Sequence, residues 1–313
     1  MAGGDPMNAI ETALSDYLQL RRGLGHQLDD AGRQLSRFVA YLNAIGAETV
    51  TMDAVLGFVF DPDLNPASKT PSKRATAVRG FARYLAGIDA ATEIPPAGLV
   101  SYRARRRTPH LFSDEDVAAV VRHARRSTLF PFRAETLTAL IGLLAVTGMR
   151  VGEVLRLGIG DIDWDNAVIL VRNTKFHKGR DVPVSASTIE ALSAYAEHRD
   201  RPRQCAPRLF VSLTGTPVIY HNFRRTFHDA ITAAGIGNDP AVRPRIHDLR
   251  HSFAVRTLLG WHRAGLDVEA LLPRLSTYLG HREPRFTYCY LSATPELFGY
   301  AEARLDAAGS VTP

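Results

Sequence analysis

Apolar residues recur at every third or fourth position through the first third of the chain, which is the period of an amphipathic helix. Four such faces are present, at about residues 5–22, 28–46, 52–59 and 73–87. Thr51 and Ser72 stand where N-caps of the third and fourth helices are expected, and Gly46 and Gly87 where helices would end. The pattern predicts a small bundle of four helices.

The helical pattern stops between residues 93 and 109. Pro95, Pro96 and Gly98 interrupt it, and a basic cluster follows at once. The cluster comprises Arg103, Arg105, Arg106 and Arg107. It is either a solvated loop or a basic strap that lies on a nucleic-acid backbone. The sequence therefore predicts a helical domain at 1–98, a basic linker at 99–109 and a second domain at 110–313.

The second domain combines helices with one short hairpin. Ser113 and Asp116 have the spacing of a capping box at the start of a helix over 114–126. A strongly apolar helix over 134–146 ends at Thr147-Gly148, and another begins near Val151. The other expected elements are strands at 167–172 and 181–184 and helices near 187–199, 222–234, 248–260, 268–278 and 295–307. The predicted fold class is mainly α with a small antiparallel β-sheet.

Composition adds an asymmetry to this picture. The 313 residues include 38 Lys and Arg against 32 Asp and Glu, a formal charge of +6, and only four of the 38 are Lys. The excess of Arg reflects either a GC-rich genome or phosphate binding by guanidinium groups. Two cysteines, the lack of a long apolar stretch and an N-terminus without a basic segment predict a cytoplasmic protein.

Four segments concentrate polar residues beside apolar helices. In TGMRVGEVLRL, Arg150 lies at a helix junction, and Glu153 is placed to hold a neighbouring backbone group or Arg; a surface Arg is the alternative. NTKFHKGRDVPV places Lys175 and Lys178 on the hairpin tip. Half of the lysines are here, which favours a proton donor because Arg does not readily give up a proton; a solvated tip is the alternative.

The third segment, HDLRHSFA, puts His247, Arg250 and His251 on one helix face. Two His four residues apart also have zinc-ligand spacing, but the metalloprotease motif has Glu directly after the first His, and an Arg on the same face opposes a metal. His251 is otherwise a core histidine. The fourth segment, LGHREPRFTYCYL, holds His281 and two tyrosines, Tyr288 and Tyr290, which in isolation favour packing.

Together these residues suffice for displacement at a phosphodiester without a metal. Charge on the non-bridging oxygens is stabilised by positioned cations, here Arg150 and Arg250. A Tyr hydroxyl can attack phosphorus and hold it as a covalent ester. Lys175 can protonate the departing oxygen, His247 can act as base, and His281 can bond to the phosphate.

The four segments resemble the boxes of the tyrosine recombinases, the phage integrase family, strongly over about 110–300 and weakly before that. TGMRVGEVLRL resembles the first arginine box, HDLRHSFA the H-x-x-R-H box and LGH the box that supplies His281. Lys175 occupies the hairpin-lysine position, five residues before Arg180, and Tyr290, nine residues after His281, the nucleophile position. The aromatic run around Tyr290 departs from the family pattern and makes Tyr288 its rival.

The resemblance implies a core-binding domain and a catalytic domain that clamp duplex DNA. Expected DNA contacts are the linker arginines, Lys178 and Arg180, and no cofactor or metal is expected. It also implies a 3′-phosphotyrosine, a free 5′-hydroxyl, a homotetrameric synapse with a Holliday-junction intermediate, and nucleoid association. The helix at 295–307 would dock on a neighbouring protomer or pack within its own chain. A chain that begins with the bundle favours a recombinase that binds core sites only.

Three rival functions remain open from the sequence. A non-catalytic DNA-binding protein of the same fold would bind DNA without forming an adduct. A type IB topoisomerase would relax supercoiled plasmid without recombining it. A zinc hydrolase would use His247 and His251 and would contain one equivalent of tightly bound zinc. The target DNA sequence and the natural task, from integration to dimer resolution, are not encoded in these motifs.

Overall fold

The computed structural model describes residues 6–26, 28–65, 68–100, 108–172, 179–199, 206–237, 243–281, 283 and 285–291. The chain forms two compact units, Met1–Arg106 and Arg107–Pro313. The division falls inside the predicted linker. Three predicted features lie outside the described residues: the linker arginines, the hairpin tip with Lys175 and Lys178, and the helix at 295–307.

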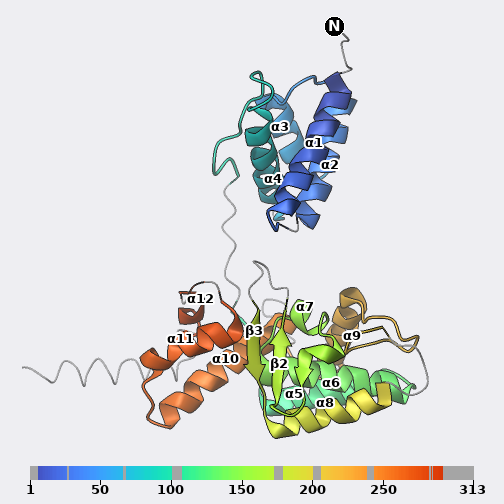
Figure 1. The fold of residues 1–313 in the computed structure, drawn as a ribbon, viewed down its shortest axis with the longest axis vertical. Helices are drawn as coiled ribbons and strands as arrows, with labels where there is room; N and C mark the ends of the chain where they lie inside the picture. The colour runs from blue at the N-terminus through green and yellow to red at the C-terminus, as the bar shows by residue number, and fades with distance from the viewer. Residues whose placement is uncertain are drawn as a thin grey trace, which may run out of the picture. The chain divides into compact units, whose positions relative to one another are not determined.

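The first unit contains four described helices, α1 (Pro6–Gly23), α2 (Asp29–Ala44), α3 (Met52–Val59) and α4 (Thr70–Leu85) (Figure 1). Their apolar faces form one core, whose fully buried members include Phe38, Leu42, Val55, Val78 and Phe81. The Thr51 hydroxyl accepts a hydrogen bond from the Ala54 amide, which confirms this N-cap. The Ser72 cap is wrong, because α4 begins two residues earlier with Pro71 in its first turn.

The second unit is built around α6 (Pro131–Thr147). This helix packs against α5 (Asp114–Arg126), α8 (Ala186–Arg199) and α10 (Ile246–Arg263). It is apolar around much of its circumference because neighbours cover several of its faces. The predicted capping box of α5 is confirmed, since the Ser113 hydroxyl accepts from the Asp116 amide and the Asp116 carboxylate accepts from the Ser113 amide.

Three short strands form an antiparallel sheet in the order β1 (Ile162–Asp163), β2 (Val168–Val171), β3 (Arg180–Pro183). The predicted hairpin is formed by β2 and β3, with Val171 opposite Arg180. The strand β1 was not predicted, because two residues are too few to show a strand pattern. Among the described residues the remaining helices are α7 (Val151–Val154), α9 (Tyr220–Ala233), α11 (Val268–Leu279), α12 (Arg285–Tyr288) and a 3-10 turn at Ile159–Asp161.

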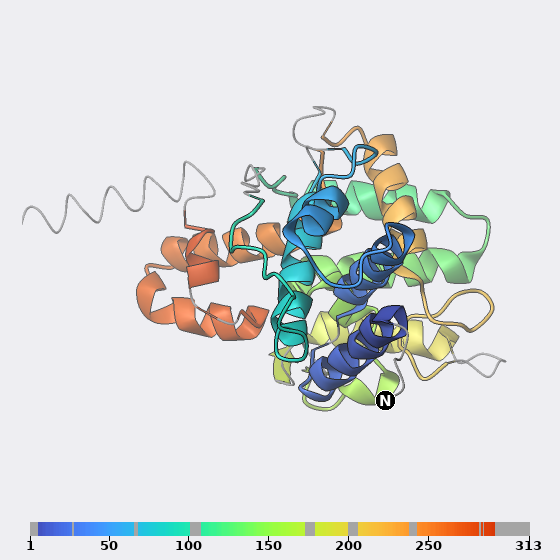
Figure 2. The same cartoon turned by 90° about the horizontal axis from the view of Figure 1, so that it is seen from above.

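The predicted fold class, mainly α with a small antiparallel sheet, is confirmed. Helices α10 and α11 lie side by side in both views and bring their own small apolar cluster to the unit (Figures 1 and 2). Tyr290 belongs to that cluster, together with Val255, Leu258 and Leu279. The chain after α11 is therefore anchored on the same helices that carry the HDLRHSFA and LGH segments.

Candidate active site

The site forms where two helices end. The residues after α6 and α11 are glycines in the left-handed conformation, Gly148 with φ 60° and Gly280 with φ 67°. A Cβ on Gly148 would lie 2.6 Å from the ring of Phe253, so the position requires glycine for space as well as for backbone conformation. The stop predicted at Thr147-Gly148 is confirmed, and it turns the chain directly into the site.

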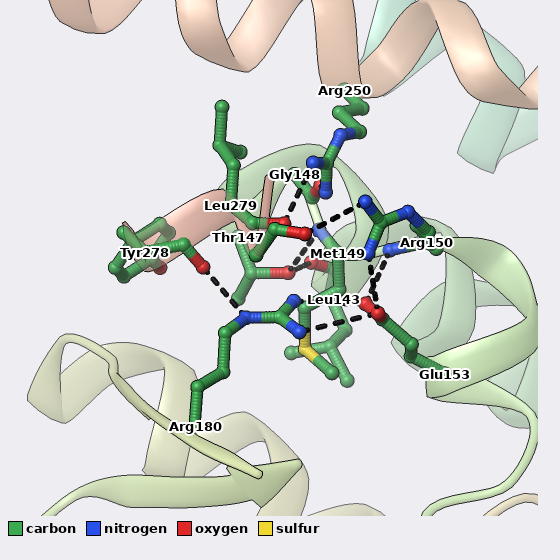
Figure 3. A network of polar contacts seen from close by, with 11 residues as sticks. Leu143, Thr147, Gly148, Met149, Arg150, Glu153, Arg180, Arg250, Tyr278 and Leu279 are labelled. Carbon is green, nitrogen blue, oxygen red and sulfur yellow. Dashed lines mark hydrogen bonds and ion pairs between the residues drawn. The ribbon is translucent and has the colours of Figure 1, made fainter. Parts of the chain in front are cut away.

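Guanidinium groups occupy the carbonyl ends of these two helices (Figure 3). The last carbonyls of a helix lack a donor within the helix and lie at its negative end. Arg250 donates from Nη1 to the Gly148 carbonyl at 2.8 Å and from Nη2 to the Leu279 carbonyl at 2.7 Å. Arg150 donates from Nη2 to the Gly280 carbonyl at 2.9 Å. The two predicted phosphate ligands are thus anchored at the same place from different parts of the chain.

A buried carboxylate connects Arg150 to a third arginine. Oε1 of Glu153 accepts from Arg150 Nη1 at 2.9 Å, and Oε2 accepts from the Arg150 amide at 3.0 Å. The same two oxygens accept from Arg180 Nη1 at 3.2 Å and Nη2 at 2.8 Å. The prediction that Glu153 holds a neighbouring backbone group and an Arg is confirmed, while 42% of the Arg150 side chain stays exposed for another partner.

The charges at the site follow from burial and pairing. Burial alone would raise the pKa of Glu153, but hydrogen bonds and charge from Arg180 and Arg150 outweigh it and lower that pKa to about 2. Burial, followed by the charge of Arg150, lowers the pKa of Arg250 to about 10. At pH 7 all three arginines are cations and Glu153 is an anion, so the four side chains together carry two positive charges.

Arg180 does not lie where a surface DNA contact would. Only 8% of its side chain is exposed, and its Nε donates to the Tyr278 carbonyl at 2.8 Å in addition to the two bonds to Glu153. In β3 the side chains of Arg180 and Val182 share the inward face, because alternate residues of a strand point the same way. The expected contact of Arg180 with DNA stays a prediction. Arg180 is part of the interior framework of the site.

Two histidines of the predicted set lie beside the arginines. Burial, followed by the charges of Arg250 and Arg150, lowers the pKa of His281 to about 4. His247 keeps part of its surface exposed, but partial burial of the residue, followed by the charges of His251 and Arg250, lowers its pKa to about 4. Both imidazoles are neutral at pH 7 and so have one nitrogen that can accept a proton. Nδ1 of His281 is 2.8 Å from the hydroxyl of the fully buried Thr287.

The structure separates the two candidate tyrosines. Tyr288 ends α12 with 54% of its surface exposed, whereas Tyr290 is 3% exposed. The Tyr290 ring stacks on His281 at a centroid distance of 6.0 Å and meets the edge of His251 at 5.3 Å. Burial raises the pKa of Tyr290, and the charge of Arg250 and a hydrogen bond to it act in the opposite direction. This geometry favours Tyr290 as the nucleophile.

Five of the predicted catalytic residues are therefore brought together: Arg150, His247, Arg250, His281 and Tyr290. The sixth, Lys175, lies outside the described residues, as do Lys178 and the four linker arginines. His251 is half-buried, and its ring packs edge-on against His247 at 5.0 Å and against Tyr290, so it lines the site. Among the described residues no three His, Cys, Asp or Glu side chains converge as a metal site would need.

Sequence reasoning missed Thr287 and did not foresee the interior contacts of Arg180. Thr287 holds the His281 ring, and nothing in its spacing announces this, because α12 is a single turn. The inward position of Arg180 did leave a signal, since it alternates with Val182, a residue expected to be buried in its strand.

A basic groove lies next to His247. It has a volume of about 550 Å³ and is lined by residues of α9, of the start of α10 and of the segment before α10. We define it by Tyr220, Arg224, His228, Arg243 and Arg245. No carboxylate is among the described residues that line it, and burial, followed by the charges of Arg243 and Arg224, lowers the pKa of His228. The groove suits a polyanion.

Comparison with known proteins agrees with this arrangement. Residues 113–296, more than half of the chain, match the model of the Phage integrase family. The chain is 39% identical over 311 residues to the "Putative integrase/recombinase y4rB" of Sinorhizobium fredii, and the match covers 96% of this chain and 98% of that protein. It is 25% identical over 300 residues to the tyrosine recombinase XerD of Halalkalibacterium halodurans, covering 92% of this chain and 95% of the relative.

Solved structures share the fold. The Tn1549 transposon integrase in complex with transposon right end DNA superimposes with a TM-score of 0.62 at 16% identity, covering 94% of this chain and 98% of that one. The XerH site-specific recombinase bound to difH substrate gives a TM-score of 0.61 at 20% identity, covering 91% and 79%. Among the described residues no helix is long and apolar enough to cross a membrane.

The family model covers the segments that carry every residue of the cluster around Tyr290, and the full-length relatives extend the similarity to the helical bundle. The chain belongs to the phage integrase family of tyrosine recombinases.

Proposed function

We propose that this protein is a site-specific DNA recombinase that cleaves and rejoins strands through a 3′-phosphotyrosine at Tyr290, without metal or ATP. The observation that supports this most is the position of the Tyr290 hydroxyl. It is buried, interacts with Arg250 and lies among neutral histidines, whereas the neighbouring Tyr288 faces solvent. A nucleophile, a base and cations for the developing charge are then in one place.

In the cleavage step the Tyr290 oxygen attacks phosphorus and its proton passes to His247. The depressed pKa of His247 keeps its imidazole unprotonated at neutral pH, which a base requires. Tyr290, with a raised pKa, does not ionise unaided, so it needs both the base and the nearby Arg250 charge. The bond between phosphorus and the 5′-oxygen breaks, and Lys175 gives the departing oxygen a proton.

Arg150 and Arg250 bind the non-bridging oxygens of the scissile phosphate. Each guanidinium has five N–H donors, and the bonds to helix-end carbonyls leave some of them for an incoming anion. The neutral ring of His281, oriented by Thr287, donates a further hydrogen bond to the phosphate. Rejoining is the reverse reaction, with a 5′-hydroxyl of the partner duplex as nucleophile and the Tyr290 oxygen as leaving group.

The two units have separate tasks in this proposal. The helical unit, with the expected domain at 1–98, is the core-binding domain, and the linker arginines and Lys178 contact the DNA backbone. The unit from 110 onwards is the catalytic domain, and its basic groove holds the duplex beside the scissile phosphate. Four protomers act in one synapse, exchange strands through a Holliday junction and use the helix at 295–307 to contact one another.

The decisive experiment compares two neighbouring tyrosines. Tyr290→Phe and Tyr288→Phe are incubated with nicked duplex oligonucleotides taken from the DNA beside the gene, and covalent protein–DNA adduct is measured on denaturing gels. We expect Tyr290→Phe to lose the adduct and keep DNA binding, because one oxygen is removed from a buried ring. Tyr288→Phe should form adduct at the wild-type level.

An adduct that persists in Tyr290→Phe and disappears in Tyr288→Phe would reverse the assignment. DNA binding by the wild-type protein without adduct on any of these duplexes would contradict an enzyme of this class. Relaxation of supercoiled plasmid carrying the same DNA, with no recombinant product, would instead indicate a topoisomerase.

A further inference from the structure

Arg180 makes three side-chain hydrogen bonds inside the site, and little of its side chain remains exposed to contact DNA. Its Nε donates to the Tyr278 carbonyl, and both terminal nitrogens donate to Glu153. Only 8% of the Arg180 side chain and 4% of the Glu153 side chain are exposed. Arg180 and Glu153 form a buried bidentate ion pair, and charge-assisted hydrogen bonds of this kind are stronger than those between neutral groups.

We propose that Arg180 is a positioning residue for strand cleavage: it neutralises Glu153 so that the charge of Arg150 remains available to the scissile phosphate, and it fixes β3 against the end of α11. The inference rests on the proposed function. It concerns a residue that touches neither the phosphate nor Tyr290 and that acts through Glu153 and Arg150.

The charge balance supports the first part. Glu153 bonds to Arg150 through its amide and its Nη1, so this pair by itself has no net charge. Arg180 adds one positive charge within hydrogen-bond distance of the same carboxylate. Without it, the full negative charge of Glu153 would face Arg150 in a poorly solvated site, where charge interactions are strong. Arg150 would then attract a phosphate less.

The geometry supports the second part. Arg180 is the first residue of β3 and pairs with Val171 of β2, so its backbone is fixed by the sheet. Its side chain reaches the carbonyl of Tyr278, two residues before Gly280, whose own carbonyl holds Arg150. A Cβ on Gly280 would lie 2.7 Å from Arg180 Nη1, so the two residues are in close contact. Arg180 therefore connects the hairpin to the helix end that positions Arg150.

The test uses five variants and one substrate. The substrate is a nicked duplex on which the wild-type protein forms adduct, and the single-turnover cleavage rate is measured at saturating DNA beside the dissociation constant. Arg180→Met removes the charge and keeps the stem, and Arg180→Lys keeps the charge. Glu153→Gln and the double variant Arg180→Met/Glu153→Gln test the coupling. Arg172→Met is the matched control, since Arg172 is an exposed arginine at the same end of the hairpin, paired with Asp161.

We expect Arg180→Met to cleave about tenfold or more slowly at saturating DNA, with a dissociation constant within about threefold of wild type, because its effect is on the transition state. Arg180→Lys should have an intermediate rate. The double variant should cleave no more slowly than Arg180→Met alone, since residues in one network are not additive. Arg172→Met should keep the wild-type cleavage rate.

Three results would overturn the proposal. The first is an unchanged cleavage rate in Arg180→Met with weaker binding and a salt dependence reduced by about 0.9 in slope, as expected of a side chain that binds a DNA phosphate. The second is a double variant in which the two losses simply add, and the third is an equal loss in Arg172→Met. If Arg180→Met does not fold, Arg180→Lys and the double variant, which leaves no unpaired buried charge, provide the comparison. Absence of adduct with wild-type protein would instead contradict the proposed function itself.

Discussion

Burial and neighbouring charges set the pKa values of several side chains in the site. His247 and His281 have pKa values of about 4, and Glu153 a pKa of about 2. In each case the native state binds a proton less readily than the unfolded chain. The histidines resist protonation because they lie partly buried beside arginines. Glu153 resists it because two arginines bind its charged form.

These shifts predict how stability depends on pH. Between about pH 6.5 and 4 the unfolded chain binds protons at His247 and His281 that the native state does not, so the free energy of unfolding falls as the pH is lowered through this range. Glu153 extends the loss to lower pH, because its pKa falls from an ordinary 4.5 in the unfolded chain to about 2 in the native state. Urea unfolding at a series of pH values measures this slope.

The control for this prediction is His281→Gln, which removes one of the two titrating imidazoles and should make the slope between about pH 6.5 and 4 shallower. A free energy of unfolding that rises on acidification through that range would contradict the assigned pKa shifts.

The contacts of individual side chains were harder to predict from the sequence than the helices and strands were. Arg150, Arg250 and Tyr290 could be proposed because each lies in a recognisable sequence box, and the structure brings the three side chains together. The interior role of Arg180 was missed, because its sequence neighbours Lys178 and Gly179 suggested a solvated hairpin. What decides its role is Glu153, which is distant in the chain, and no local pattern encodes that contact.

At the scale of elements, the sequence predicted long helices well and short ones poorly. α6 was predicted from a long, strongly apolar stretch that ends at a glycine, and α10 was also predicted, within about three residues of its observed bounds. α12 and β1 are too short to have a period, and they form because tertiary contacts support them. The prediction that Ser72 caps α4 was wrong because proline is favourable in the first turn of a helix, so α4 begins at Thr70 and takes in Pro71.

Helix caps offer a test at this scale. Ser113→Ala removes the hydroxyl that accepts from the Asp116 amide at 3.1 Å and should lower the free energy of unfolding by about 1 kcal/mol. Ser72→Ala is the matched control, since Ser72 does not cap α4, and it should change stability by less than about 0.5 kcal/mol. Thermal or urea unfolding compares the two, and equal losses would contradict the assignment of the caps.

At the scale of the whole molecule, the positions of the arginines are more informative than their number. The excess of arginine did not identify a function, but the structure gathers several of these side chains in two places. Arg150, Arg180 and Arg250 lie around the helix ends, and Arg224 and Arg243 line the basic groove.

Binding to duplex DNA should therefore weaken steeply as salt is raised. Arg224→Ala and Arg243→Ala should each reduce the slope of log K against log salt by about 0.9 for every phosphate that the variant no longer neutralises. The control is Arg126→Ala, which removes an exposed arginine of α5 outside the groove and should leave the slope unchanged. Fluorescence anisotropy over a salt series gives these slopes, and equal slopes in all four proteins would exclude the groove as a binding surface.

The two glycine-ended helices have a consequence for how such an enzyme can change over generations. Arg150 and Arg250 close the carbonyl ends of α11 and α6, so the groups proposed to hold the phosphate also hold the catalytic unit together. Replacing Arg250 leaves two buried carbonyls without a donor, which weakens the fold as well as the chemistry. Substitutions of these arginines that reduce activity would also reduce the amount of folded protein. Selection for folding alone would therefore preserve much of the site.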